Sequence, residues 1–105
     1  MKLKTYCFDI DGTICSTNCE YKDAEPFISV IAYINKLYES GNEIIMFTSR
    51  GTKSGINWYD FTKNQIDTWG LQYHKLIMGK PQADVFIDDR AININTWCKK
   101  NNIIK

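Results

Sequence analysis

The sequence lacks long apolar runs and has no excess of charge of one sign. A membrane-spanning helix needs about 18 or more consecutive apolar residues, and no stretch here approaches that length. Thirteen basic residues against twelve acidic ones leave a net charge of +1, which supplies no broad field for holding nucleic acid or an anionic membrane surface. We therefore expect no membrane partner, and we expect any anionic ligand to be held by local groups.

The start of the chain, MKLKTYCF, also lacks the apolar core of a secretion signal, so we expect a cytoplasmic protein. Its 105 residues suffice for one compact domain and are too few for two domains with separate cores. A hydrophobic fraction of 44% and a charged fraction of 24% are ordinary for a globular protein. We expect residues 1–105 to form a single domain.

Cysteine and histidine are too sparsely arranged for a zinc site. Cys15 and Cys19 are not followed by a second closely spaced pair, and the single histidine, His74, stands far from them. Cys7 and Cys98 complete the set of four, which we interpret as reduced thiols because no export signal is present. His74 itself is expected to be structural, since nothing near it in the sequence forms a proton relay.

Apolar periodicity predicts an alternation of strands and helices. The helix beginning near Phe27 shows apolar residues at helical spacing between Pro26 and Gly41, which suit its first turn and its end. The run Ile44 to Phe47 is short, continuous and partly β-branched, as in a strand buried on both faces. Strands are predicted over 3–9, 44–47, 75–78 and 84–87, and helices over 27–37, 57–69 and 91–100.

Such an alternation implies an α/β fold with a mainly parallel sheet covered by helices on both faces. Ligands of these sheets bind beyond the carboxyl ends of the strands. In this chain three predicted strands end in polar residues: Asp9 and Asp11, Thr48 and Ser49, and Asp88 and Asp89. We therefore expect a functional site at this edge of the sheet.

The clustered carboxylates predict a cation. If Asp9, Asp11 and Asp88 or Asp89 lie within about 4 to 6 Å of one another, each pair repels by roughly 1 to 4 kcal/mol. That cost is large against a total stability of about 5 to 15 kcal/mol unless a cation offsets it. Carboxylate and carbonyl oxygens are the ligands that Mg²⁺ prefers, so we expect Mg²⁺ as the cofactor.

The other polar groups suit a phosphate. Thr48 and Ser49 have hydroxyls that can donate to phosphate oxygens, Gly12 lets backbone N–H groups come close, and Lys80 supplies a positive charge. A carboxylate can attack phosphorus and divide the hydrolysis into two easier steps. We predict Asp9 as this nucleophile and Asp11 as the general acid and base.

These residues resemble the motifs of the haloacid dehalogenase-like (HAD) superfamily of phosphatases. DIDGT at 9–13, a strand ending in Thr48, Lys80, and the pair Asp88 and Asp89 follow that family's order over essentially the whole chain. The resemblance implies a Rossmann-like, doubly wound sheet of order 3-2-1-4. It also implies that Asp9, the carbonyl of Asp11, and Asp88 with or without Asp89 hold the metal, and that Thr48 and Lys80 hold the phosphate.

The chain departs from many members of that superfamily in having no room for a cap domain. Only 16–23 follows the first motif and only 52–56 the second. We expect an open site, unless subunits of a homo-oligomer cover it, and a sugar phosphate or a related small ester as the substrate. Arg50, Lys53 and Tyr21 are candidates for contacts with the leaving group because of their loop positions.

Other functions remain open on the sequence. The chain could be a phosphate- or metal-binding module that has lost catalysis, although retention of both Asp9 and Asp11 favours an enzyme. A phosphotransferase would share the first half-reaction, and the missing cap favours hydrolysis because water has free access. A phosphatase acting on nucleic-acid ends is disfavoured by the near-neutral charge.

Overall fold

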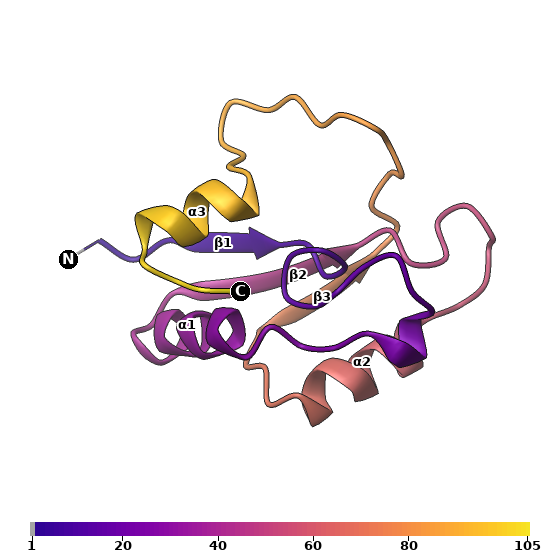
Figure 1. The fold of residues 1–105 in the computed structure, drawn as a ribbon, viewed down its shortest axis with the longest axis horizontal. Helices are drawn as coiled ribbons and strands as arrows, with labels where there is room; N and C mark the ends of the chain where they lie inside the picture. The colour runs from indigo at the N-terminus through magenta and orange to yellow at the C-terminus, as the bar shows by residue number, and fades with distance from the viewer. Residues whose placement is uncertain (1) are drawn as a thin grey trace.

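Three parallel strands form the sheet of the computed structural model, which describes residues 2–105. The elements are β1 (Thr5–Phe8), the 3₁₀ helix η1 (Tyr21–Asp23), α1 (Ile28–Glu39), β2 (Glu43–Thr48), α2 (Tyr59–Thr68), β3 (Lys75–Met78) and α3 (Ile94–Lys100) (Figure 1). The first three predicted strands and all three predicted helices are thus confirmed, with ends displaced by a few residues.

The strands lie in the order β1-β2-β3, and both neighbouring pairs are parallel. In the register, Met46 at the centre of β2 stands opposite Phe8 of β1 and Leu76 of β3. Each parallel pair is connected through a helix, α1 between β1 and β2 and α2 between β2 and β3. The fold is therefore α/β with a parallel sheet, and its carboxyl ends lie together at one edge.

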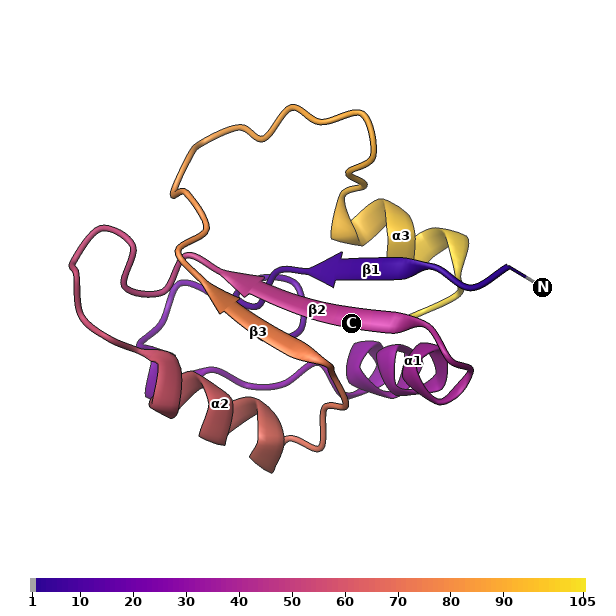
Figure 2. The same ribbon diagram turned by 180° about the vertical axis from the view of Figure 1, so that it is seen from behind.

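The core lies on one face of the sheet. Along β2, the side chains of Ile44, Met46 and Thr48 are buried, whereas those between them are half-buried. One cluster joins this face to all three helices; its buried members include Phe8, Ile44, Met46, Val30, Ile31, Ile34, Ile66 and Cys98. Figure 2 shows the sheet from its other side, with no helix in front of it.

The opposite face carries the alternate residues of each strand. Cys7 is exposed, Ile45 and Phe47 are half-buried, and Ile77 is exposed. The expectation of helices on both faces is wrong for this structure. The reason is that both crossovers run in the same direction across the sheet, and a right-handed connection then places both helices on the same side.

Residues 84–87 do not form the predicted fourth strand. They lie in the long loop between β3 and α3, which arches past the free edge of β1 in both views (Figures 1 and 2). Val85, Phe86 and Ile87 are 70%, 52% and 94% exposed. The predicted strand order was 3-2-1-4. The observed sheet has the order 3-2-1 and lacks the predicted fourth strand.

Local signals explain several helix ends. Asn57 accepts the backbone N–H of Tyr59 through Oδ1 at 3.0 Å, which satisfies a free donor at the start of α2. Asn93 does the same for Asn95 at the start of α3. Gly41 follows α1 with φ of +99°, a left-handed conformation that glycine adopts without strain.

His74 is a structural residue, as expected. Its Nδ1 accepts the backbone N–H of Ile44 at 3.0 Å, and its ring stacks on Tyr38 with centroids 4.6 Å apart. The imidazole therefore extends the hydrogen bonding between β2 and the start of β3.

No helix within residues 2–105 combines the length and apolar character needed to cross a bilayer.

Candidate functional site

Asp9 and Lys80 form the centre of the candidate site. Asp9 directly follows β1, and Lys80 lies two residues beyond β3. The Nζ atom of Lys80 is 3.5 Å from Oδ2 of Asp9, with side chains 19% and 33% exposed, respectively. The backbone N–H of Lys80 donates to the carbonyl oxygen of Thr48 at 3.0 Å. The carboxyl ends of all three strands are thus linked, as the sequence predicted for Asp9, Thr48 and Lys80.

The carboxyl group of Asp9 is partly withdrawn from water. This burial raises its pKa above the ordinary value, although the backbone N–H of Ile10 and the ammonium group of Lys80 oppose the shift. Asp11 adds a weaker repulsion. Burial thus destabilises the charged form of Asp9, and a bound cation or phosphoryl group with positive character would stabilise it.

The loop after Asp9 is a tight, internally bonded turn. Gly12 has φ of +82° and donates its backbone N–H to the carbonyl oxygen of Cys15 at 2.9 Å. Ile10, Ile14 and Cys15 are completely buried and fix the turn to the core. The alternation of buried and polar residues therefore holds Asp9, Asp11 and Gly12 at the sheet edge, and the left-handed conformation explains the glycine.

Asp11 is paired with Arg50 through both carboxylate oxygens. Nε of Arg50 donates to Oδ2 at 2.9 Å and Nη2 donates to Oδ1 at 2.8 Å. The Arg50 side chain is 0% exposed and that of Asp11 is 24% exposed. Burial by itself would lower the pKa of the guanidinium, but the hydrogen bonds and negative charge of Asp11 raise it above the ordinary value.

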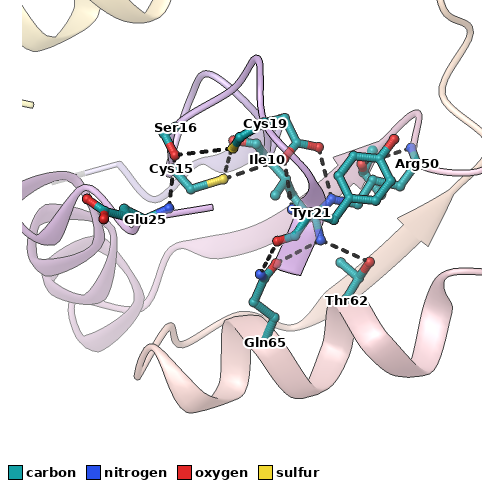
Figure 3. Close-up of polar contacts among 11 residues, drawn as sticks. Ile10, Cys15, Ser16, Cys19, Tyr21, Glu25, Arg50, Thr62 and Gln65 are labelled. Carbon is teal, nitrogen blue, oxygen red and sulfur yellow. Dashed lines mark hydrogen bonds and ion pairs between the residues drawn. The ribbon is translucent and has the colours of Figure 1, made fainter. Parts of the chain in front are cut away.

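The rest of the Arg50 side chain also makes several contacts (Figure 3). Its Nη1 donates to Oε1 of Gln65 at 2.8 Å and to Oγ1 of Thr62 at 3.4 Å. The ring of Tyr21 covers the guanidinium, whose carbon lies 4.5 Å from the ring centroid. The Arg50 side chain is completely buried among these partners, so its predicted contact with a leaving group does not fit the structure.

Thr48 and Ser49 lie where β2 ends. Thr48 is 1% exposed, and its Oγ1 accepts the backbone N–H of Arg50 at 3.1 Å. That bond leaves the hydroxyl proton available as a donor. Ser49 is half-buried and follows directly. The two hydroxyls are thus at the predicted edge, and Thr48 is almost completely buried there.

The remaining leaving-group candidates lie in different surroundings. Lys53 is exposed in the loop between β2 and α2, and it makes no ion pair within residues 2–105. Tyr21 is half-buried between Arg50 and Trp58, whose ring centroid is 4.9 Å away. A small pocket of about 120 Å³ opens beside Arg50, with Thr52, Ile56, Trp58 and Gly79 among its lining residues.

A larger pocket, of about 630 Å³, lies away from these residues between α2 and β3. Its lining includes Tyr38, Lys63, Tyr73, His74 and Ile77. None of the predicted site residues lines it. Size alone therefore does not identify the functional site here, because the predicted site residues lie at the sheet edge around Asp9 and not in the larger pocket.

The structure does not bring Asp88 and Asp89 to Asp9. Both are exposed in the loop before α3, where Asp88 accepts the backbone N–H of Arg90 at 2.8 Å. No group of three possible metal-ligating side chains occurs within residues 2–105. Arg50 holds the Asp11 carboxylate, so at this edge the predicted ligands that remain for a cation are the Asp9 carboxylate, which lies beside Lys80, and the backbone carbonyl of Asp11. In this arrangement the residues do not fit a complete Mg²⁺ site.

Reasoning from the sequence missed the polar residues around Arg50. Thr62 and Gln65 lie three positions apart on α2, beside the buried Ile66. Gln65 also donates through Nε2 to the carbonyl oxygen of Tyr21 at 2.7 Å, which ties α2 to the segment after the DIDGT turn. Two polar residues on the inward face of an amphipathic helix were the signal that a buried partner exists.

Neither a protein-family model nor a curated protein matches the chain. Among solved structures, the chain is similar to the crystal structure of an MCSG target from Vibrio cholerae, with a TM-score of 0.82. The two are 24% identical, and the match covers 90% of this chain and 87% of the other. At that identity the likeness supports the α/β fold over nearly the whole chain and nothing about activity.

Proposed function

We propose that this protein is a phosphatase that hydrolyses a phosphate monoester through an aspartyl-phosphate on Asp9. The observation that carries the proposal is the Asp9 and Lys80 pair, a partly buried carboxylate 3.5 Å from an ammonium group at the carboxyl edge of a parallel sheet. The resemblance of DIDGT, Thr48 and Lys80 to the HAD-like phosphatases supports the same assignment, because these residues meet at that edge.

In the first step, an Oδ atom of Asp9 attacks phosphorus and the bond from phosphorus to the ester oxygen breaks. Lys80 is close enough to interact with a phosphoryl oxygen next to Asp9, and Asp11 gives the departing oxygen its proton. In the second step, water attacks the phosphoryl group and passes a proton to Asp11. The bond from phosphorus to Asp9 then breaks, which releases phosphate and restores the carboxylate.

We also propose that the enzyme depends on Mg²⁺ and that residues 84–87 complete the sheet when the metal binds. β1 has a free edge, and the apolar side chains of Val85, Phe86 and Ile87 are exposed in the loop between β3 and α3. Pairing this segment with β1 would give the strand order 3-2-1-4, bury apolar surface and carry Asp88 and Asp89 toward Asp9. The ring of Phe86 already lies 4.6 Å from Nζ of Lys80.

A small phosphate ester is the proposed substrate. The pocket beside Arg50 measures about 120 Å³, which accommodates only a small group. The net charge of +1 supplies no extended field for a nucleic-acid backbone. A homo-oligomer whose subunits cover the open edge, and a cytoplasmic location, are parts of the same proposal.

The binding-module alternative has one specific observation in its favour. Both oxygens of Asp11 accept hydrogen bonds from Arg50, so the predicted acid and base is already engaged. In that case the protein binds phosphate near Lys80 and releases none from an ester.

A panel of phosphate esters, assayed with Mg²⁺ and with chelator, tests the proposal. Asp9→Asn is the diagnostic variant, because it keeps the shape of the side chain and removes the nucleophile. Asp60→Asn, an acidic residue in the first turn of α2, is the matched control. We expect Mg²⁺-dependent release that Asp9→Asn abolishes and Asp60→Asn retains. Absence of release from every ester by a folded wild-type protein would favour the binding module.

A further inference from the structure

Arg50 is the most completely buried charged side chain of the site, and nearly all of its hydrogen-bonding groups have partners. Two of its nitrogens contact Asp11, a third contacts Gln65 and Thr62, and its backbone N–H contacts Thr48. Burying a charge costs desolvation free energy, which its partners repay only when their geometry is good. The many specific partners of Arg50 therefore suggest that its geometry has a role at the site. Its position links the ends of β1 and β2 to α2.

We propose that Arg50 is a positioning residue that fixes the Asp11 carboxylate as the base for water in the second half-reaction. This inference rests on the proposed phosphatase function. The two hydrogen bonds from Nε and Nη2 form a fork that sets the plane of the carboxylate, which a single bond cannot do. Gln65 and Tyr21 in turn hold the guanidinium in place.

The geometry distinguishes the two oxygens of Asp11. Oδ1 accepts from Nη2 of Arg50 and lies 3.6 Å from the thiol of Cys15, which can also donate to it. Oδ2 accepts only from Nε of Arg50 among residues 2–105. A carboxylate oxygen has two lone-pair directions, so Oδ2 keeps one for a water molecule. The 24% exposure of the side chain leaves such a water a route to it.

The chemical step follows from this arrangement. Water gives a proton to Oδ2 of Asp11 while its oxygen forms a bond to phosphorus, and the bond from phosphorus to Asp9 breaks with its electron pair returning to the carboxylate. The products are inorganic phosphate and free Asp9. A disordered Asp11 would slow this step, because a base must meet the proton at hydrogen-bond distance.

The ester p-nitrophenyl phosphate separates this step from the first one. Its leaving group departs as a stable anion without a proton, so formation of phospho-Asp9 does not require Asp11 as an acid. Release of p-nitrophenolate therefore reports the first half-reaction, and release of phosphate reports the second. Both rate constants can be measured after rapid mixing for each variant.

The test compares Arg50→Lys with wild type, Asp11→Asn and Ile66→Val. Lysine keeps the positive charge and loses the fork, whereas Ile66→Val removes one buried methyl group from α2 without touching Asp11. We expect Arg50→Lys and Asp11→Asn to lower the rate constant for phosphate release by about 10-fold or more, within the roughly 10² to 10⁴ that a general base supplies. The rate constant for p-nitrophenolate release should change by less than about threefold in both. Ile66→Val should preserve the ratio of the two rate constants.

Gln65→Met serves as a second variant, since it leaves Arg50 in place and removes one of its anchors. We expect Gln65→Met to lower the rate constant for phosphate release less than Arg50→Lys does, and again to leave the rate constant for p-nitrophenolate release nearly unchanged. This variant keeps the test possible if circular dichroism shows that Arg50→Lys is unfolded. Equal slowing of both steps, or an unchanged ratio in folded Arg50→Lys, would overturn the positioning role. If the wild type shows neither step, the proposed function itself fails and the inference fails with it.

Discussion

Oδ2 of Asp9 lies 3.5 Å from Nζ of Lys80, although the two residues are 71 positions apart in the sequence. The pair joins the end of β1 to the turn after β3, past the end of the central strand β2. Because all three strands are parallel, their carboxyl ends lie at the same edge of the sheet. The contact is thus a direct consequence of the strand topology.

The effect of Asp9→Asn on stability should depend on pH. Because burial raises the folded-state pKa of Asp9, the folded chain binds this proton more tightly than the unfolded chain. The carboxylate therefore costs stability as pH rises from the unfolded pKa of about 3.9 through the folded value. We expect the metal-free variant to have a higher Tm than wild type near neutral pH, by up to about 4 °C, and the same Tm in acid below both pKa values.

Asp67→Asn supplies a control of opposite sign for that experiment. Hydrogen bonds from Lys63 and Tyr73 lower the pKa of the Asp67 carboxyl, so its contribution is present at neutral pH and is lost as pH falls through the folded pKa. The variant should have a slightly lower Tm near neutral pH, because the pair is exposed. A lower Tm of Asp9→Asn at neutral pH would contradict the assigned cost of burying Asp9.

The four cysteines should react with iodoacetamide in a defined order. Burial and the nearby charge of Asp11 raise the pKa of Cys15 to about 12, so at pH 8.5 on the order of one thiol in a few thousand is the reactive thiolate. Cys98 is buried, and its pKa is raised by burial; Cys7 is exposed but also has a raised pKa. We expect exposed Cys19 to be labelled first and Cys7 second, as measured by peptide mass spectrometry.

Unfolding is the control for the labelling order. In denaturant all four thiols should react at similar rates, because the effects of burial and of Asp11 disappear. Rapid labelling of Cys15 in the folded protein would show that the turn after Asp9 opens readily. It would also weaken the case for a preorganised site.

Gly51 and Gly55 form a matched pair for alanine substitution in the loop between β2 and α2. Both have positive φ, +83° and +76°. A Cβ atom at Gly51 would come within 2.1 Å of the carbonyl oxygen of Ile56, whereas at Gly55 it would meet nothing within 4 Å. Gly55→Ala should therefore cost only the left-handed conformation, about 1 kcal/mol. Gly51→Ala should cost at least about 2 kcal/mol in urea unfolding, since backbone must move.

Equal costs for the two alanine variants would mean that the loop rearranges freely. Such a result would matter for function, because Gly51 follows Arg50 directly. A loop that absorbs a Cβ without cost would not hold the guanidinium at Asp11.

Hydrogen exchange over residues 84–87 tests the proposed fourth strand. In the metal-free protein, we expect these amides to exchange rapidly, because the segment lies exposed in a loop. Mg²⁺ together with inorganic phosphate should slow their exchange, as pairing with β1 would protect them. The double variant Asp88→Asn and Asp89→Asn should lose this protection and keep that of β2. Rapid exchange under both conditions in the wild type would exclude docking of the segment by these ligands.

Much of the fold could be predicted because its signals are short-range. The spacing of Val30, Ile31 and Ile34 identifies the buried side of α1, and the run around Ile44 identifies β2. The same reasoning failed for Val85 to Ile87. A short apolar run predicts a strand only where a neighbour pairs with it, and in this structure none does.

The candidate site divides in the same way. Local periodicity marks the strand ends, so the positions of Asp9, Thr48 and Lys80 after successive strands can be predicted, and a parallel sheet brings such ends to one edge. The pairing of Arg50 with Asp11 could not be predicted in this way. That contact joins residues 39 positions apart and depends on how α2 packs against the core, which no local pattern records.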